Sequence, residues 1–244
     1  MNSECFKKSI QNNEVSARIA YIVSLLKLKL GDKVLNIGIS NIPELEIFLE
    51  NKVKECVTID IDKEKLRHAN TFLKKTKLIE GDILKEPAFK NNYFDKVIIL
   101  EVLEHLEDDI KAANWINSVM KKGGTLIVAV PNTHPLHYLN PVKYLEHKRH
   151  YTNESITKLL IEQGFKIDNL NVVENWTLLA NLYIHLFFKF ILKRTIPFGI
   201  LKKSSEKTYS QKNYKGLDII VKATKISDIS SAIINKIPKT IQSN

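Results

Sequence analysis

The chain has 244 residues, and its 44% hydrophobic content is enough for one domain with a sizeable core and a decorated end. Its two cysteines, Cys5 and Cys56, match no metal-binding or redox spacing, which argues against such a centre and for a reducing, cytosolic setting. The formal charge of +10 is concentrated, because residues 189–225 carry ten Lys or Arg side chains against two acids. We therefore expect a basic surface in the C-terminal third, and no signal peptide, since no apolar run follows the polar start.

Strand-like and helix-like stretches alternate along the chain. Residues 15–30 carry apolar side chains at helical spacing and predict an amphipathic helix. Short apolar runs predict strands at 34–37, 56–60, 77–79, 96–100, 125–130, 166–173 and 217–223. The stretches between them predict helices at 43–50, 63–75, 108–120 and 153–163. Because several strands are continuously apolar, helices are expected on both faces of a doubly wound, mostly parallel seven-stranded α/β sheet.

Polar residues follow the ends of several predicted strands. The first strand leads into a turn at Gly38 and then a helix, which is how many α/β domains hold a nucleotide-like cofactor. The second ends at Asp60, about twenty residues further on, where a carboxylate can accept hydrogen bonds from a ribose diol. Asp82 follows the third strand and Glu101 the fourth. Each residue alone is explained by a turn or a helix cap, but their joint order indicates a ligand site at the strand ends.

Together these motifs resemble the class I S-adenosylmethionine-dependent methyltransferases. The resemblance runs from about residue 17 to 165 and resumes with the last strand at 217. It is carried by the segments VLNIGIS, VTIDIDKEKL, GDI, FDKVIILEVLEHLEDD, MKKGGTLIVAVPN and HYTNESITKLLIEQGF. Within that superfamily the chain is most similar to the ubiquinone-biosynthesis O-methyltransferases, in which an arginine-containing helix precedes the glycine turn as ARIAYI does here. The resemblance implies a Rossmann-like methyltransferase fold and S-adenosyl-L-methionine as the cofactor.

The resemblance also implies roles for individual residues. Arg18 would hold the cofactor carboxylate, and Gly38 would let the methionine part approach the backbone. Asp60 would bind the ribose hydroxyls, Asp82 would frame the adenine with its neighbour, and Leu100 would line the pocket floor. The full set of expected cofactor-binding residues is Arg18, Asn36, Gly38, Ser40, Asp60, Ile61, Asp82, Ile83, Leu100 and Glu101.

Two positions depart from the pattern of the resembling family. Asp or Glu is usual where Asn36 stands, and glycine is usual where Ser40 stands. Asn can form hydrogen bonds but cannot offer a full negative charge to the ammonium group of the cofactor. Ser40 is small, so the backbone can still approach a ligand if its φ is negative. We therefore expect cofactor binding to persist in weakened form, and the alternative is a decayed site on an intact fold.

The motif Glu101-x-x-Glu104-His105 has two interpretations. One turn of helix would place the three side chains on a common face, where they could hold a divalent ion beside a substrate hydroxyl. Alternatively, the turn caps a helix and shapes the pocket without any metal, so a divalent metal is possible but no metal ligand is assigned. Further candidates for the substrate side are histidines in the following stretch, namely His134, His137, His147 and His150.

An insertion is expected before the last strand, at residues 174–215. Its apolar and aromatic stretch, 176–192, has polar residues every four positions, which would form one narrow stripe on a helix. Seventeen residues that include His and Lys are too few and too polar for a membrane span. With the basic residues that follow, the stretch suits a helix lying in an anionic lipid interface, and a lid or dimerisation helix is the alternative. The methyltransferase domain is expected over 1–225, with a weakly ordered tail at 226–244.

These observations predict an S-adenosylmethionine-dependent methyltransferase that acts on a small-molecule or lipid-linked acceptor. O-methylation is expected ahead of N- or C-methylation, with His105 as the catalytic base that takes the hydroxyl proton. The expected location is cytoplasmic, with a possible peripheral position on the inner face of an anionic membrane, and nucleic acid is not an expected partner. The alternatives are a non-catalytic binding protein with a methyltransferase fold and an RNA ribose methyltransferase.

Overall fold

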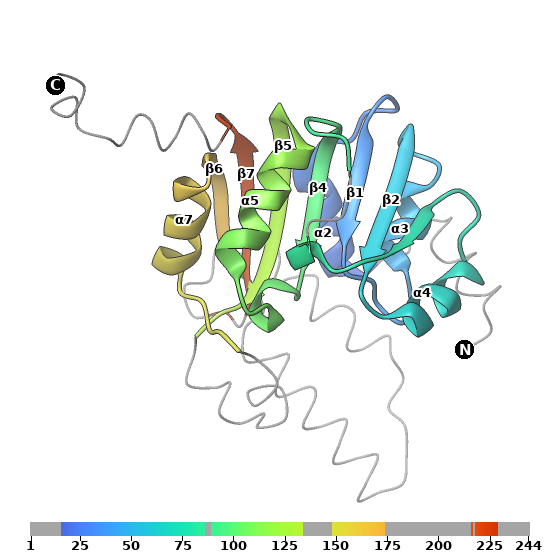
Figure 1. Ribbon diagram of the computed structural model, residues 1–244, viewed down its shortest axis with the longest axis horizontal. Helices are drawn as coiled ribbons and strands as arrows, with labels where there is room; N and C mark the ends of the chain where they lie inside the picture. The colour runs from blue at the N-terminus through green and yellow to red at the C-terminus, as the bar shows by residue number, and fades with distance from the viewer. Residues whose placement is uncertain (1–15, 86–88, 134–147, 174–215, 217, 229–244) are drawn as a thin grey trace, which may run out of the picture.

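The computed structural model describes residues 16–85, 89–133, 148–173, 216 and 218–228. They form a seven-stranded sheet with the strand order β3-β2-β1-β4-β5-β7-β6 (Figure 1). The strands are β1 Lys33–Ile37, β2 Glu55–Asp60, β3 Lys77–Glu80, β4 Phe94–Leu100, β5 Met120–Pro131, β6 Phe165–Val173 and β7 Asp218–Lys225. The first five strands in this order, from β3 to β5, pair in parallel, whereas β7 runs antiparallel to both of its neighbours. The predicted doubly wound, mostly parallel sheet is confirmed.

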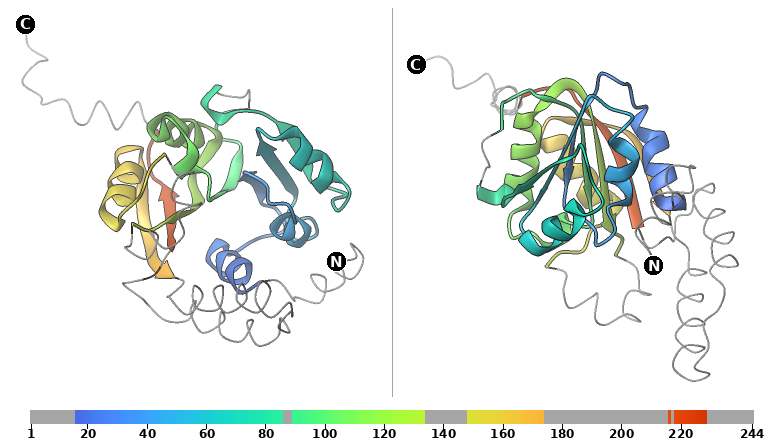
Figure 2. Two further views of the ribbon diagram at one scale, coloured as in Figure 1. Left: turned by 90° about the horizontal axis from the view of Figure 1, so that it is seen from below. Right: turned by 90° about the vertical axis from the view of Figure 1, so that its right-hand side faces the viewer.

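Helices lie on both faces of the sheet (Figure 2). α5 (Asp109–Val119) and α7 (Asn153–Glu162) cover one face. α2 (Ala17–Leu26) and α3 (Glu44–Leu49) cover the other, and α4 (Lys63–Asn70) packs beside β3. This is the layered arrangement that the continuously apolar strands predicted.

Successive side chains of β1 fill the two layers in turn. Leu35 and Ile37 belong to the core cluster under α5 and α7, whereas Val34 belongs to the cluster under α2 and α3. None of the three is more than 2% exposed. Because burial of one such side chain contributes about 1.5–3 kcal/mol, these two cores fix the strand ends firmly in place.

Two helices are shorter than the sequence predicted. The helix expected over 15–30 ends at Leu26, because Lys27 takes a left-handed conformation with a φ of 50°. The helix expected over 63–75 ends at Asn70, where backbone hydrogen bonds tighten into a turn. Apolar periodicity continues past both ends, so it overestimates helix length where a turn follows.

The strand order reverses between β1 and β4, and the carboxyl ends of β1 to β5 share one edge of the sheet. Val173 at the end of β6 is paired with Asp218 at the start of β7, at this same edge. The expected insertion at 174–215 therefore leaves and re-enters the sheet there, although it lies outside the described residues, as does most of the expected tail. No described helix is long and apolar enough to cross a membrane.

Candidate functional site

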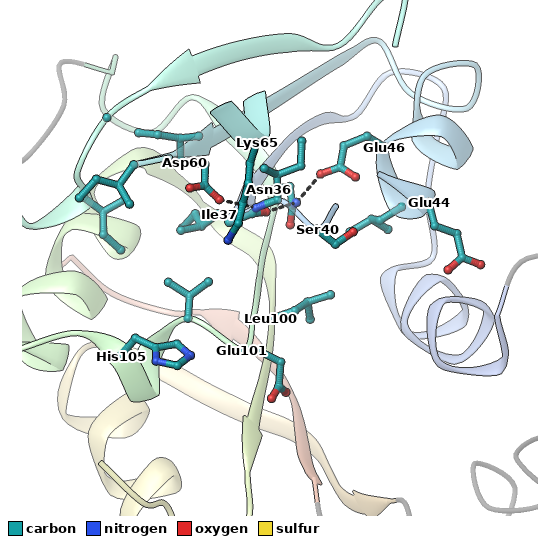
Figure 3. A pocket seen from close by; sticks show the side chains of 18 of the residues that line it. Asn36, Ile37, Ser40, Glu44, Glu46, Asp60, Lys65, Leu100, Glu101 and His105 are labelled. Atoms are coloured by element: carbon teal, nitrogen blue, oxygen red, sulfur yellow. Dashed lines mark hydrogen bonds between the residues drawn. The ribbon is translucent and has the colours of Figure 1, made fainter. Parts of the chain in front are cut away.

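A cavity of about 630 Å³ opens at the carboxyl ends of β1 to β4, where the strand order reverses. All of the residues that the sequence predicted as catalytic or cofactor-binding line it. They are Arg18, Asn36, Gly38, Ser40, Asp60, Ile61, Asp82, Ile83, Leu100, Glu101 and His105. In Figure 3, Asn36 and Asp60 lie along one side of the cavity, with Leu100, Glu101 and His105 along the other. The structure thus brings together residues from four strands and from α2.

Gly38 forms the turn between β1 and α3 in a conformation that favours glycine. Its φ is +86°, and a Cβ added to it would lie 2.5 Å from Cγ2 of Val102. The N–H of Gly38 donates to the carbonyl of Ile59 at 2.8 Å, which holds the turn against the end of β2. Because Gly38 has no side chain, a ligand can approach the protein backbone closely at this wall of the cavity.

Asp60 presents its carboxylate to the cavity in a fixed position. One oxygen accepts a hydrogen bond of 2.7 Å from the N–H of Ile39, and the other accepts one of 2.7 Å from the N–H of Asp62. Each carboxylate oxygen has two acceptor sites, so both retain capacity for a hydroxyl donor. Asp60 thus joins the glycine turn to the end of β2 and can still bind a diol.

Asn36 is held between the glycine turn and a buried acid that the sequence analysis did not single out. Its Nδ2 donates to the carbonyl of Gly38 at 2.7 Å and to Oε1 of Glu46 at 2.6 Å (Figure 3). Thr58 donates to the same oxygen of Glu46 at 3.2 Å. Burial raises the pKa of Glu46, and the nearby charge of Asp60 adds to that rise, while the two donors oppose it.

Arg18 of α2 is paired with two acids. Its Nη2 lies 2.5 Å from Oε1 of Glu101 and 3.0 Å from Oδ2 of Asp218. Glu101 has a φ of +53°, which is uncommon for a residue other than glycine and typical of strained positions at functional sites. The structure therefore joins the start of α2, the end of β4 and the start of β7 at the rim of the cavity.

The expectation that Glu101, Glu104 and His105 share one helical face is wrong. Glu101 precedes the 3₁₀ turn η2 (Leu103–His105) in a left-handed conformation, so the chain does not form a regular α-helical turn there. Glu101 and His105 line the cavity, whereas Glu104 is fully buried. Within the described part of the chain, no group of three His, Cys, Asp or Glu side chains could hold a metal ion.

Glu104 lies beneath the cavity rather than in it. No described residue donates a hydrogen bond to its carboxylate oxygens, and Oε1 is 3.9 Å from Nε2 of His105. Burial, and then the negative charge of Glu101, raise the pKa of Glu104 to about 8. His105 is the exposed member of this pair, with 44% of its side chain accessible, and it is the one that faces a ligand.

The segment after the histidine-rich stretch is tied to η2. The N–H groups of Lys148 and Arg149 donate to the carbonyl of Glu104 at 2.9 and 3.2 Å. Arg149 also pairs with Asp109 at 2.8 Å, and the hydroxyl of Tyr151 donates to the same carboxylate at 2.9 Å. Of the candidate substrate-side histidines, His150 is exposed beside this contact. The others, His134, His137 and His147, lie outside the described residues.

Sequence reasoning missed several residues of the cavity. Glu46 was assigned only to the opening of a helix, yet it lies on the buried face of α3 together with Leu45 and Leu49. An acid on the apolar face of a short helix is the signal that could have revealed it. Asp218, which contacts Arg18 but does not line the cavity, starts an apolar strand and gave a similar signal. Further lining residues include Ser16, Ile19, Glu44 and Lys65.

Comparisons with known proteins agree with the fold. Residues 35–128 match the family described as a methyltransferase domain. An S-adenosylmethionine-dependent methyltransferase from Mesorhizobium loti superposes with a TM-score of 0.60, at 14% identity, over 86% of this chain and 98% of that one. Phosphoethanolamine N-methyltransferase 2 of Haemonchus contortus, solved with S-adenosyl-L-methionine, superposes with a TM-score of 0.63, at 18% identity, over 86% of this chain and 52% of that one. At these identities the superpositions show the fold, which is the Rossmann-like methyltransferase fold.

One curated relative matches part of the chain. An uncharacterized protein of Methanocaldococcus jannaschii is 40% identical over 82 residues, which are 34% of this chain and 35% of that protein. The chain therefore spans about a third of the length of this relative.

Proposed function

We propose that this chain, which carries a methyltransferase domain over residues 35–128, transfers a methyl group from S-adenosyl-L-methionine to an oxygen of a small-molecule or lipid-linked acceptor. The observation that carries the proposal is the convergence of strand-end residues on one cavity. Asp60 and Leu100 end β2 and β4, Gly38 and Asp82 follow β1 and β3, and all four line the cavity. In open α/β sheets this is the place where nucleotide-like ligands bind.

The residues present fit that cofactor. A Cβ at Gly38 would collide with the side chain of Val102, so this turn conformation requires glycine. The carboxylate of Asp60 has free acceptor sites for ribose hydroxyls, and Oδ1 of Asn36 is buried without a donor among the described residues. Arg18 would hold the carboxylate of the methionine part, from the rim. Asp82 with Ile83 would frame the adenine.

S-adenosyl-L-methionine, when bound, supplies an electrophilic methyl group, and the rate then depends mainly on how the chain positions the acceptor. His105 is the group on the cavity wall that can take the hydroxyl proton, since a ring nitrogen of its neutral imidazole can accept one. Oε1 of the buried Glu104 lies 3.9 Å from Nε2 of His105 and limits the positions that the ring can take. The apolar side chains of Leu100 and Ile19 would exclude water from the reacting atoms.

The motif at 101–105 does not fit a resident divalent metal, because Glu104 is buried away from the cavity. We therefore route no step through a metal, although the chain resembles the ubiquinone-biosynthesis O-methyltransferases in this motif. We assign it to that group as part of the proposal.

A membrane-linked acceptor is supported by the placement of the insertion. The described residues that flank this segment, Val173 and Asp218, are paired at the edge of the sheet that carries the carboxyl ends of β1 to β4. The apolar stretch 176–192 and the basic residues after it suit an anionic lipid interface. An enzyme docked through this segment would bring its cavity to the lipid surface, and we place the protein at the cytoplasmic face of a membrane.

The proposal is tested by calorimetric titration with S-adenosyl-L-methionine and S-adenosylhomocysteine. The wild-type protein should bind both, and Asp60→Ala should weaken binding because charge-assisted hydrogen bonds contribute about 1.5–3 kcal/mol each. The absence of any heat at millimolar ligand would refute the enzyme assignment. Binding without turnover of any hydroxylated lipid or small molecule would instead favour the non-catalytic binding protein.

A further inference from the structure

We propose that Glu46 of α3 supplies the negative charge that faces the ammonium group of the bound cofactor, in place of an acid at the end of β1. The inference rests on the proposed function and assigns one more ligand-positioning residue to the same cavity. Asn36 stands at the position where the resembling family has an acid, and it carries no charge. The structure brings the carboxylate of Glu46 next to that amide, from the following helix.

The contact between Asn36 and Glu46 is specific. Nδ2 of Asn36 donates to Oε1 of Glu46 at 2.6 Å and to the carbonyl of Gly38 at 2.7 Å, so one amide links the acid to the glycine turn. Thr58 of β2 is a second donor to the same carboxylate. Glu46 lines the cavity, although only 2% of it is exposed. Its carboxyl group is therefore held at the cavity wall in a single orientation.

The amide at position 36 and the acid at position 46 are complementary. If position 36 carried an acid as well, two carboxylates would lie at hydrogen-bond distance, and one of them would have to keep a proton. With Asn36, the single acid has two neutral donors and no carboxylate in direct contact. Compared with the resembling family, the acid is thus at position 46 of α3 instead of position 36 of β1, and one acid remains at this wall.

A fully buried acid needs a reason to be there, because an uncompensated charge in a low-dielectric site is costly. Burial raises the pKa of Glu46, while its backbone N–H, Asn36 and Thr58 oppose that rise through hydrogen bonds. The groups that face it are Asn36, Thr58 and, at longer range, the carboxylate of Asp60. Among the described residues no Lys or Arg is paired with its carboxyl group, so its charged form needs a nearby cation. An ammonium group at the glycine turn meets that need.

The test compares two ligands that share adenosine and sulfur. S-adenosylhomocysteine carries the ammonium and carboxylate groups, whereas 5′-methylthioadenosine lacks both. In calorimetric titrations, Glu46→Gln should weaken S-adenosylhomocysteine about 10- to 100-fold, the loss typical of one buried charge-assisted contact, and leave 5′-methylthioadenosine within about threefold of the wild type. Since an acid repels the ligand carboxylate, a selective loss identifies the ammonium group as its partner.

Two variants make the comparison sharp. Glu64→Gln removes an exposed acid that pairs with Arg67 and does not line the cavity, and it should leave both affinities within about threefold. The exchange variant Asn36→Asp/Glu46→Gln keeps one acid and one amide in contact, so it should restore tight binding of S-adenosylhomocysteine. It also carries the test if Glu46→Gln alone does not fold.

Equal weakening of both ligands by Glu46→Gln, or no weakening of either, would overturn the inference, as would an exchange variant that folds but binds S-adenosylhomocysteine no better than Glu46→Gln. These outcomes differ from failure of the proposed function. In that case the wild-type protein itself binds neither ligand.

Discussion

Nη2 of Arg18 lies 2.5 Å from Oε1 of Glu101, so the side chain expected to hold the cofactor carboxylate is already paired with the acid that ends β4. The same nitrogen is 3.0 Å from Asp218. A ligand carboxylate therefore joins an existing network and does not meet an isolated cation. The network also ties α2 to the sheet, which couples the stability of that helix to the rim of the cavity.

The first prediction concerns this network. Arg18→Met should lower the free energy of unfolding by about 1–3 kcal/mol, because two partly buried acids lose their partner. Adding Asp218→Asn should recover part of that loss, since one of the uncompensated charges disappears. Urea unfolding of the two single variants and the double variant gives the coupling energy. Strictly additive losses would show that Arg18 and Asp218 are not energetically linked.

The second prediction concerns the glycine turn. Gly38→Ala should destabilise the protein by about 1–3 kcal/mol and weaken cofactor binding, because its φ is positive and its Cβ would overlap Val102. Gly123→Ala is the matched control, since its φ is +78° but nothing lies within 4 Å of the added Cβ. The control should lose stability but keep its affinity for the cofactor. Thermal unfolding with and without S-adenosylhomocysteine separates the two effects, and equal loss of ligand binding in both variants would count against a role for the turn.

The third prediction concerns pH. The pKa of Glu104 is raised from 4.5 to about 8, so the folded state holds its proton more tightly than the unfolded state. The stabilising contribution of this proton is complete below pH 4.5 and is lost as the pH rises through about 8. Relative to Glu104→Gln, the wild type should lose about 1 kcal/mol of unfolding free energy per pH unit in this window. Parallel stability curves for the two proteins would contradict the burial of this acid.

The fourth prediction concerns residues 176–192. Large apolar side chains contribute ~25 cal/mol per Å² of area buried in a lipid interface, and each nearby basic residue adds about 1 kcal/mol at an anionic surface. The wild-type protein should therefore sediment with liposomes that contain acidic lipid and be released only partly by salt. Changing Leu182, Leu186 and Phe190 to Ser should abolish sedimentation and leave cofactor binding intact. A wild-type protein that stays in the supernatant at low salt would favour a lid or dimerisation helix.

The layered sheet could be predicted from the sequence because its strands are apolar on both faces, as in 96–100 and 125–130. The reversed direction of β7 could not, since an apolar run such as 217–223 has the same composition in either direction. The cavity residues at strand ends were also predictable, because the fold class dictates where the strand ends meet. The left-handed backbone of Glu101 could not be predicted, because a positive φ is uncommon for a residue other than glycine and no residue type marks it in the sequence.

The antiparallel pairing of β6 with β7 does not depend on the length of the segment that links them. Val173 and Asp218 are register partners, so the chain leaves one strand and enters its neighbour across a single strand spacing. A short hairpin turn can bridge that spacing, and no strand pair would be broken by such a replacement. The pairing of β6 with β7 therefore sets no particular length for the segment 174–215. Relatives could gain, lose or exchange it while keeping the same cavity.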